Sequence, residues 1–409
     1  MIIQGKYFRE TLSNGLRIVG CRRQGLVSYI GVVVNVGSRD EDSSHEGLAH
    51  FVEHTIFKGT DKRRVHQISA RMEVVGGELN AYTSKEETMV YTNAPSGYED
   101  RALELLSDII SSSRFPETEI NKEREVIVEE IYSYLDSPAD RVYDEYEELA
   151  YKGSGLAHNI LGSPESVREI KSDICRSFLH KFYVPQNMVV YCVTPLPDEQ
   201  IIRKVEKYFN SLKQEEVKHN RITPPPMETF DVIRDNATHQ ANTIMGARAF
   251  SRKDPRRFAL FLLNNHLAGP CMNSLLTREL RDKRGYVYTV DSNVSLLSDT
   301  GLLMIYFGCD PSNVKKCRTI IRREVEKLCS KTMSDQSFEK IKRQYCGQLI
   351  SSSDHIEHRA MSLGKSVLYH DEIHDITSTA ERIRAVTAQE LREVAEIVFG
   401  KGLSTLTLT

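Results

Sequence analysis

The sequence predicts an α+β protein with two homologous domains, each a β-sheet backed by helices. Its 409 residues exceed what one hydrophobic core usually supports, so two domains are expected. Stretches typical of strands alternate with paired helical stretches on both sides of a proline-rich segment. Three consecutive prolines at 224–226 can continue neither a helix nor a central strand. We therefore predict domains at 1–212 and 231–409, joined by a linker at 213–230.

The first half is expected to begin with strands and to continue with helices. Asn14 and Gly15 are typical of a hairpin turn, and residues 28–38 are rich in β-branched residues, which favour strands. Residues 42–44 can cap a helix that starts near Gly47. Further elements are predicted in this order: a helix over 65–76, a strand region over 79–95, helices over 98–113 and 117–136, more helix to about 182, and a strand over 188–195.

The second half repeats the order of these elements. A strand over 301–308 is followed by helices over 312–329 and 335–351, as a strand and two long helices follow one another in the first half. Near the ends of the halves, residues 173–183 match residues 388–400. Because of this repeat, both domains are expected to share one architecture.

The composition argues against several classes of protein. The formal net charge is −3 and acidic and basic residues are interleaved, so neither nucleic acid nor an anionic membrane surface is an expected partner. The first residues lack a basic start and an apolar segment, and no apolar run reaches roughly 18 residues, so we expect neither secretion nor a membrane span. The eight cysteines are scattered without a C-x-x-C pair, which is typical of reduced core residues in the cytoplasm.

Residues 47–54, with the sequence GLAHFVEH, predict a metal site on a helix. Residues three and four apart share a helix face, so His50 and His54 can offer imidazole nitrogens to one ion, with Glu53 beside them. Neutral imidazoles at this spacing suit zinc, which keeps an open position for water in catalytic sites. A nearby carboxylate can then take a proton from that water. Five residues alone are suggestive, and a third protein ligand is needed.

The predicted helix over 117–136 offers that third ligand. Glu123 and Glu130 are seven residues apart and share one face, whereas Glu129 is turned about 100° away. Three apolar positions mark this helix as packed against a core: Val126, Ile127 and Ile131. A pair of carboxylates beside a core needs a compensating cation. We favour Glu130 as the ligand, with Glu129 as the alternative.

These residues closely resemble the pitrilysin (insulinase) family, which is marked by an inverted H-x-x-E-H motif. GLAHFVEHTIFKGT is similar to its central helix, and Glu130 stands 76 residues beyond His54, the family's spacing for the third ligand. The short length is similar to that of the bacterial processing-peptidase branch. The resemblance implies a pitrilysin-like metallohydrolase fold and one Zn²⁺ per chain. It also implies the roles: His50, His54 and Glu130 as zinc ligands, Glu53 as general base, and Glu123 as a nearby support.

Residues 76–91 are similar to the substrate-binding edge strand of this family. In that strand the substrate backbone pairs with the protein. The resemblance implies substrate-binding roles for four residues: Asn80, Ala81, Tyr82 and Thr83.

Residues 280–290 resemble a motif of the family that supplies an arginine and a tyrosine seven residues apart. The resemblance implies that Arg281 and Tyr288 hold the substrate carbonyl or stabilise the oxyanion. The preceding loop at 267–274 departs from the family pattern, because it has one glycine and a proline where the family has a glycine-rich sequence.

The predicted function is that of a zinc-dependent endopeptidase acting on short or unfolded peptides. The resemblance implies a homodimer, or a heterodimer with a related subunit, that encloses a chamber. The main alternative is a non-catalytic scaffold or partner subunit of a heterodimeric peptidase of the same family, and a second is a zinc hydrolase of small amides. The remaining histidines of interest are interpreted as ordinary structural or surface residues: His158, His355 with His358, and His370 with His374.

Overall fold

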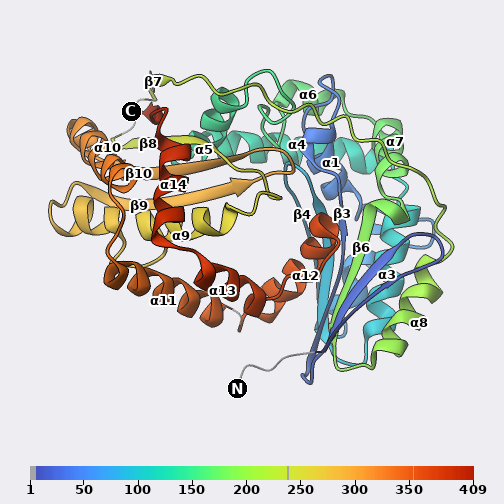
Figure 1. The fold of residues 1–409 in the computed structure, drawn as a ribbon. Coiled ribbons are helices and arrows are strands. Elements are labelled where there is room, and N and C mark those ends of the chain that lie inside the picture. Colours follow the sequence, from blue (N-terminus) through green and yellow to red (C-terminus); the bar gives the residue numbers. More distant parts are fainter. Residues whose placement is uncertain (1–5, 237–238, 353) are drawn as a thin grey trace. The chain divides into compact units, whose positions relative to one another are not determined.

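The computed structural model describes residues 6–236, 239–352 and 354–409, which form two compact units (Figure 1). The described residues of the first unit are 6–132, 158–221 and 354–374. Those of the second unit are 133–157, 222–236, 239–352 and 375–409. This division differs from the contiguous domains expected from the sequence. Residues 133–157 come from the first half but lie in the second unit, and residues 354–374 come from the second half but lie in the first unit. The change of unit after Arg221 falls inside the expected linker.

The first unit is built on a six-stranded sheet with the order β1-β2-β6-β3-β5-β4. Its strands are β1 (Lys6–Thr11), β2 (Arg17–Arg22), β3 (Val27–Val34), β4 (Glu78–Thr83), β5 (Thr88–Pro95) and β6 (Met188–Thr194). Strands β2 and β6 pair in parallel, and all other neighbours pair antiparallel. The region 79–95 is therefore a hairpin of two strands, and β4 is an edge strand, which among the described residues pairs only with β5.

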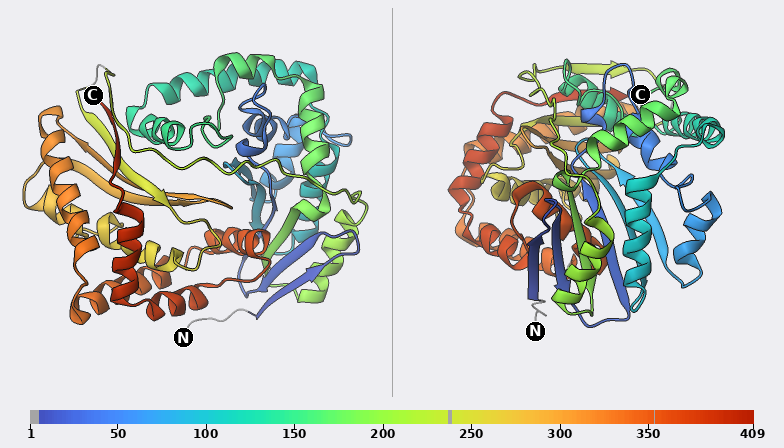
Figure 2. Two further views of the ribbon diagram at one scale, coloured as in Figure 1. Left: turned by 45° about the horizontal axis from the view of Figure 1, so that its top comes forward. Right: turned by 90° about the vertical axis from the view of Figure 1, so that its right-hand side faces the viewer.

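Helices cover one face of this sheet and form the larger core of the first unit. They are α1 (Leu48–Thr55), α2 (Val65–Glu73), α3 (Glu99–Ser112), α4 (Glu117–Leu135), α6 (Pro164–Glu169), α7 (Ser172–Phe182) and α8 (Asp198–Phe209). Their apolar faces pack on alternate residues of the strands, such as Ile18, Val32 and Val190. Figure 2 shows these helices and the sheet from two further sides.

Helix α12 (Ile356–His370) covers the opposite face of the same sheet, although it comes from the second half of the chain. Leu363 and Val367 pack against Val33 and Tyr191 there. Gly364 permits this close approach, because a Cβ at its position would lie 2.7 Å from the ring of Tyr191. Both sheet faces are thus covered, which explains why every residue of β6, with the sequence MVVYCVT, is buried.

The second unit is built on a five-stranded sheet with the order β7-β11-β8-β10-β9. Its strands are β7 (Asp231–Arg234), β8 (Ala241–Ala249), β9 (Val287–Leu296), β10 (Gly301–Cys309) and β11 (Ser404–Leu408). Five helices pack into the core of one face: α9 (Arg257–Ala268), α10 (Val314–Ser330), α11 (Asp335–Ser352), α13 (Ile376–Ala385) and α14 (Ala388–Phe399). Helix α5 (Pro138–Ala150), from the first half, covers the other face through Val142 and Tyr146, which pack on Ile244 and Leu406.

The repeat predicted from the sequence is present in the two sheets. The order β2-β6-β3-β5-β4 corresponds to β7-β11-β8-β10-β9, with the parallel pair and the antiparallel pairs at the same places. Two sheets backed by helices confirm the predicted fold class. Helices α5 and α12 each follow the long helix of their own half, and each packs on the sheet of the other half. The two halves therefore exchange equivalent helices.

Two smaller expectations can be compared with the structure. None of the helices in the described part of the chain combines the length and the apolar character that crossing a bilayer requires. All eight cysteines are free, and six of them are buried: Cys21, Cys175, Cys192, Cys309, Cys317 and Cys346. Their burial agrees with the interpretation of most cysteines as core residues.

Candidate metal centre

Helix α1 is held in the core of the first unit by the residues between its polar positions. Leu48, Ala49, Phe51 and Val52 are buried and pack under the helix. Its N-cap residue, Gly47, has a φ of 92°. This left-handed conformation favours glycine. The helix begins directly after Gly47 and carries the polar residues His50, Glu53 and His54.

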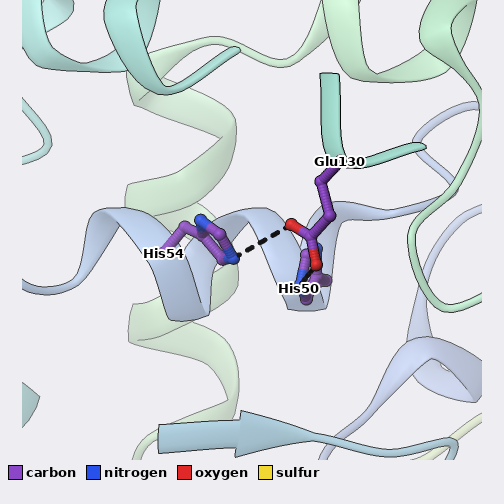
Figure 3. A group of neighbouring side chains, drawn as sticks. All are labelled: His50, His54 and Glu130. Carbon is purple, nitrogen blue, oxygen red and sulfur yellow. Dashed lines mark ion pairs between the residues drawn. The ribbon is translucent and has the colours of Figure 1, made fainter. Parts of the chain in front are cut away.

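Two imidazoles from α1 and one carboxylate from α4 converge (Figure 3). One possible ligand atom from each of His50, His54 and Glu130 lies within 4.8 Å of the others. Nε2 of His54 is 3.5 Å from Oε2 of Glu130, and Nε2 of His50 is 3.9 Å from Oε1. Glu129 is exposed and does not belong to this group. The structure thus brings together the three residues expected to be ligands.

The chemistry of this group suits a zinc ion. Two nitrogens and one carboxylate oxygen are typical of a catalytic zinc, with a fourth position left for water. Burial and the neighbouring His54 lower the pKa of His50 to about 3, so its imidazole is neutral and available as a ligand. Its Nδ1 is buried and has no hydrogen-bond partner among the described residues. Within the described ranges, no other group of three or more His, Cys, Asp or Glu side chains has this spacing.

Glu123 and Lys58 support His54 from the side away from Glu130. Nδ1 of His54 is 3.0 Å from Oε1 of Glu123, and Nζ of Lys58 is 2.7 Å from the second oxygen of that carboxylate. Burial raises the pKa of Glu123, but hydrogen bonds from His54 and Lys58 outweigh burial and lower it overall. A carboxylate on the far nitrogen of a histidine fixes the ring so that the other nitrogen faces the metal. Lys58 was not among the predicted residues, because its partner Glu123 is distant in the sequence.

Replacing Glu123 by glutamine is expected to weaken zinc binding by about 10–100-fold, because partners of this kind orient the ligand and raise its basicity. The amide keeps an acceptor for His54 but loses the charge that pairs with Lys58. Competition with a zinc-binding indicator measures the affinity. Glu125→Gln is the matched control, because Glu125 is exposed on the same helix. Equal affinities for the two variants would show that Glu123 has no such role.

Glu53 lies between the two histidines in sequence and is partly buried. Burial raises the pKa of its carboxyl, and the carboxylate of Glu130 adds to the rise, while Thr83 and His54 oppose it. A raised pKa brings a carboxylate closer to the pH at which a general base works best. Thr83 lies on the edge strand β4. A residue of the predicted substrate-binding strand therefore lowers the pKa of Glu53, the predicted general base.

The four residues predicted on β4 point in two directions. Of the four, Ala81 packs toward the core that contains α1, as does the neighbouring Leu79. Tyr82 lies on the opposite face, where its hydroxyl donates to Glu87 at 3.0 Å and the Nζ of Lys365 from α12 lies 5.0 Å from the centre of its ring. Asn80 is exposed. Because Tyr82 is engaged on the far face, only its backbone is placed to pair with a peptide at this edge.

Arg281 and Tyr288 both belong to the second unit and are exposed. Arg281 lies in a π-helical turn (Thr277–Asp282), and Tyr288 is on the edge strand β9. Arg281 also lines a pocket of about 360 Å³ beside the loop at 267–274. Their part in catalysis stays a prediction.

The other histidine pairs have contacts of their own. The ring centres of His355 and His358 are 5.7 Å apart, and those of His370 and His374 are 4.7 Å apart. Nε2 of His374 is 3.2 Å from Glu372. Neither pair belongs to a group of three possible ligands among the described residues.

Comparisons with known proteins find similarity along almost the whole chain. A model described as insulinase (peptidase family M16) matches residues 21–164, and a model described as the peptidase M16 inactive domain matches residues 170–345. An uncharacterized zinc protease of Streptomyces coelicolor is 32% identical, covering 97% of this chain and 88% of that protein. Another, of Bacillus subtilis, is 30% identical, covering 96% and 95%.

Solved structures share the fold. A protease from Helicobacter pylori has a TM-score of 0.92 at 23% identity, covering 99% of both chains. A peptidase M16 inactive domain from Pseudomonas fluorescens has a TM-score of 0.91 at 16% identity, covering 98% of this chain and 97% of that one. At these identities the likeness establishes the architecture alone.

Proposed function

The chain belongs to the insulinase (M16) family of peptidases, and on that premise we propose that it is a zinc-dependent endopeptidase. One observation carries the proposal: the imidazoles of His50 and His54 and the carboxylate of Glu130 converge from α1 and α4, and Glu53 precedes His54 on α1. The zinc proteases among its relatives support the choice of metal.

His50, His54 and Glu130 would hold one zinc ion, which when bound activates water and polarises a carbonyl. Glu53 accepts a proton from the attacking water and returns it to the leaving amine. Glu123 keeps the imidazole of His54 turned toward Glu130. Arg281 and Tyr288 are proposed to hold the carbonyl oxygen as negative charge develops on it.

The substrates we propose are short or unfolded peptides. No strand of the described part of the chain pairs with the outer side of the edge strand β4, so an extended peptide can add to the sheet there through backbone hydrogen bonds. Only a chain whose backbone is free of its own secondary structure can pair in this way. Since the backbone supplies most of these contacts, sequence selectivity should be loose. Asn80, Ala81, Tyr82 and Thr83 are the residues proposed to contact the peptide, Tyr82 through its backbone.

We propose that the working form pairs this chain with a second copy or with a related subunit, and that it acts in the cytoplasm. The alternative of a non-catalytic partner subunit draws support from the second half, which matches a model described as an inactive domain. The first half nevertheless has all three candidate ligands and the candidate base. These four side chains favour an enzyme over a scaffold.

Metal removal tests the proposed activity. The purified chain is expected to cleave a quenched oligopeptide, to lose that activity in a zinc chelator, and to regain it when zinc is added. A small amide substrate, assayed in parallel, should remain uncleaved. Cleavage that persists in metal-free protein would contradict zinc dependence, a zinc-loaded chain that cleaves nothing would favour the non-catalytic subunit, and cleavage of the amide alone would favour a small-amide hydrolase.

A further inference from the structure

Glu41 lies in the loop that leads into α1, and its carboxylate is bonded to the start of that helix. Oε2 accepts a hydrogen bond from the backbone N–H of Gly47 at 2.8 Å, and Oε1 accepts one from the N–H of Ala49 at 2.7 Å. Gly47 is the N-cap residue and has no side chain to accept these donors itself. The side chain of Glu41 is 0% exposed, so water does not compete for these contacts.

His158 holds the same carboxylate from a distant part of the sequence. Its Nε2 is 3.0 Å from Oε2 of Glu41, and its side chain is only 12% exposed. The Nζ of Lys85 donates a hydrogen bond to the backbone carbonyl of His158. Lys85 lies in the turn between β4 and β5. His158 therefore joins the loop before the metal-site helix to the turn after the proposed substrate strand.

The residues that follow His158 also pack against the start of α1. A Cβ at Gly47 would lie 2.6 Å from the carbonyl oxygen of Leu161, and a Cβ at Gly162 would lie 2.3 Å from the carbonyl oxygen of Glu46. The hydroxyl of Ser166 donates to that same Glu46 carbonyl at 2.7 Å. The start of α1 cannot shift without displacing this segment.

The charges at this point favour a fixed arrangement. A buried carboxylate is costly unless its charge is matched and its oxygens are hydrogen-bonded. Here the two amide donors, the positive end of the α1 dipole and the imidazole of His158 all act on Glu41. A displacement of the helix would weaken all of these contacts at once. Catalytic groups have to be held to within about 0.5 Å, and His50 directly follows the bonded Ala49.

From these contacts we propose that Glu41 and His158 are positioning residues of the metal centre. They hold the first turn of α1 so that His50 and His54 face Glu130, and through Lys85 they keep that helix aligned with β4. This inference rests on the proposed zinc-dependent function and adds two residues that lie outside the group of candidate ligands.

The test compares His158→Ala, His158→Gln and Glu41→Gln with the unmodified chain. The readouts are zinc affinity by chelator competition, the visible absorption spectrum of the cobalt-substituted protein, and the melting temperature. We expect His158→Ala and Glu41→Gln to bind zinc about tenfold more weakly, at the lower end of the range for groups that orient ligands indirectly. Their cobalt spectra should shift, because the geometry of the ligands changes. His158→Gln keeps a side-chain N–H donor and should recover most of the affinity.

The matched control is His374→Ala, which removes another histidine paired with a glutamate, 3.2 Å from Glu372, in the same unit but outside the metal group. It should leave zinc affinity and the cobalt spectrum unchanged. The inference is overturned if folded Glu41→Gln and His158→Ala proteins keep both unchanged, even when their melting temperatures fall, since Glu41 would then be a structural cap alone. An unmodified chain that binds no zinc would instead overturn the proposed function.

Discussion

Replacing Glu53 by glutamine is expected to leave zinc bound while kcat falls by about 10²–10⁴-fold, the usual contribution of a general base. The amide has nearly the shape of the carboxylate but cannot accept a proton from water. None of the three candidate ligands is altered, so the metal content should stay near one ion per chain. Steady-state cleavage of a quenched peptide, with zinc measured on the same sample, gives both quantities.

The metal content is the control for this first prediction. A variant that loses both zinc and activity would report a damaged site and would assign no role to Glu53. A zinc-loaded variant with kcat close to that of the unmodified chain would reject Glu53 as the base. KM should change little, because Glu53 is assigned to proton transfer and β4 to peptide binding.

Replacing Glu130 by glutamine is expected to remove zinc and, with it, peptide cleavage. Its carboxylate is the only group from outside α1 in the cluster, at 3.5 Å and 3.9 Å from the two imidazoles. The neutral amide is a much weaker zinc ligand than a carboxylate. The loss of affinity should therefore exceed the roughly 10–100-fold effect of losing a partner that only orients a ligand. Zinc per chain after dialysis measures the result.

Glu129→Gln is the matched control for this second prediction. It makes the same chemical change one residue earlier on α4, on an exposed side chain outside the cluster. Zinc and activity should be retained. The reverse result, with zinc lost from Glu129→Gln and kept by Glu130→Gln, would mean that α4 presents a different face to α1.

The shared helix faces of the candidate ligands could be predicted from the sequence, because helix geometry relates residues over short spacings. His50 and His54 are four apart on α1, and Glu123 and Glu130 are seven apart on α4, so each pair shares a face whatever the rest of the fold does. The same reasoning was wrong for Val126, which is 52% exposed. The buried stripe of α4 runs through Ile127 and Ile131, and Val126 is turned about 100° from Ile127.

The supporting contacts could not be predicted from local spacing. Lys58, which follows α1, reaches Glu123 on α4, and Glu41 reaches His158 across 117 residues. An isolated charged residue in a loop carries no local sign of its partner. The sheet face on which the side chain of Tyr82 lies could not be predicted either. Alternation along β4 defines two faces but does not show which of them packs against α12.

The exchanged helices limited the prediction of domain boundaries. The change of unit after Arg221 falls within the proline-rich segment at 213–230. The apolar faces of α5 and α12 show that each helix must be buried. These faces do not show on which of the two sheets each helix packs, because both sheets have similar apolar surfaces.

The exchange of α5 and α12 makes this single chain comparable to a domain-swapped dimer whose two subunits have been fused end to end. Helix α5 of the first half covers the sheet of the second half, and α12 of the second half covers the sheet of the first. Neither half alone therefore covers both faces of its own sheet. A fragment that ended at the linker would expose Val33, Val189 and Tyr191 to water. The first half without the second is therefore expected to be less stable than the whole chain, because α12 supplies part of the core on its sheet.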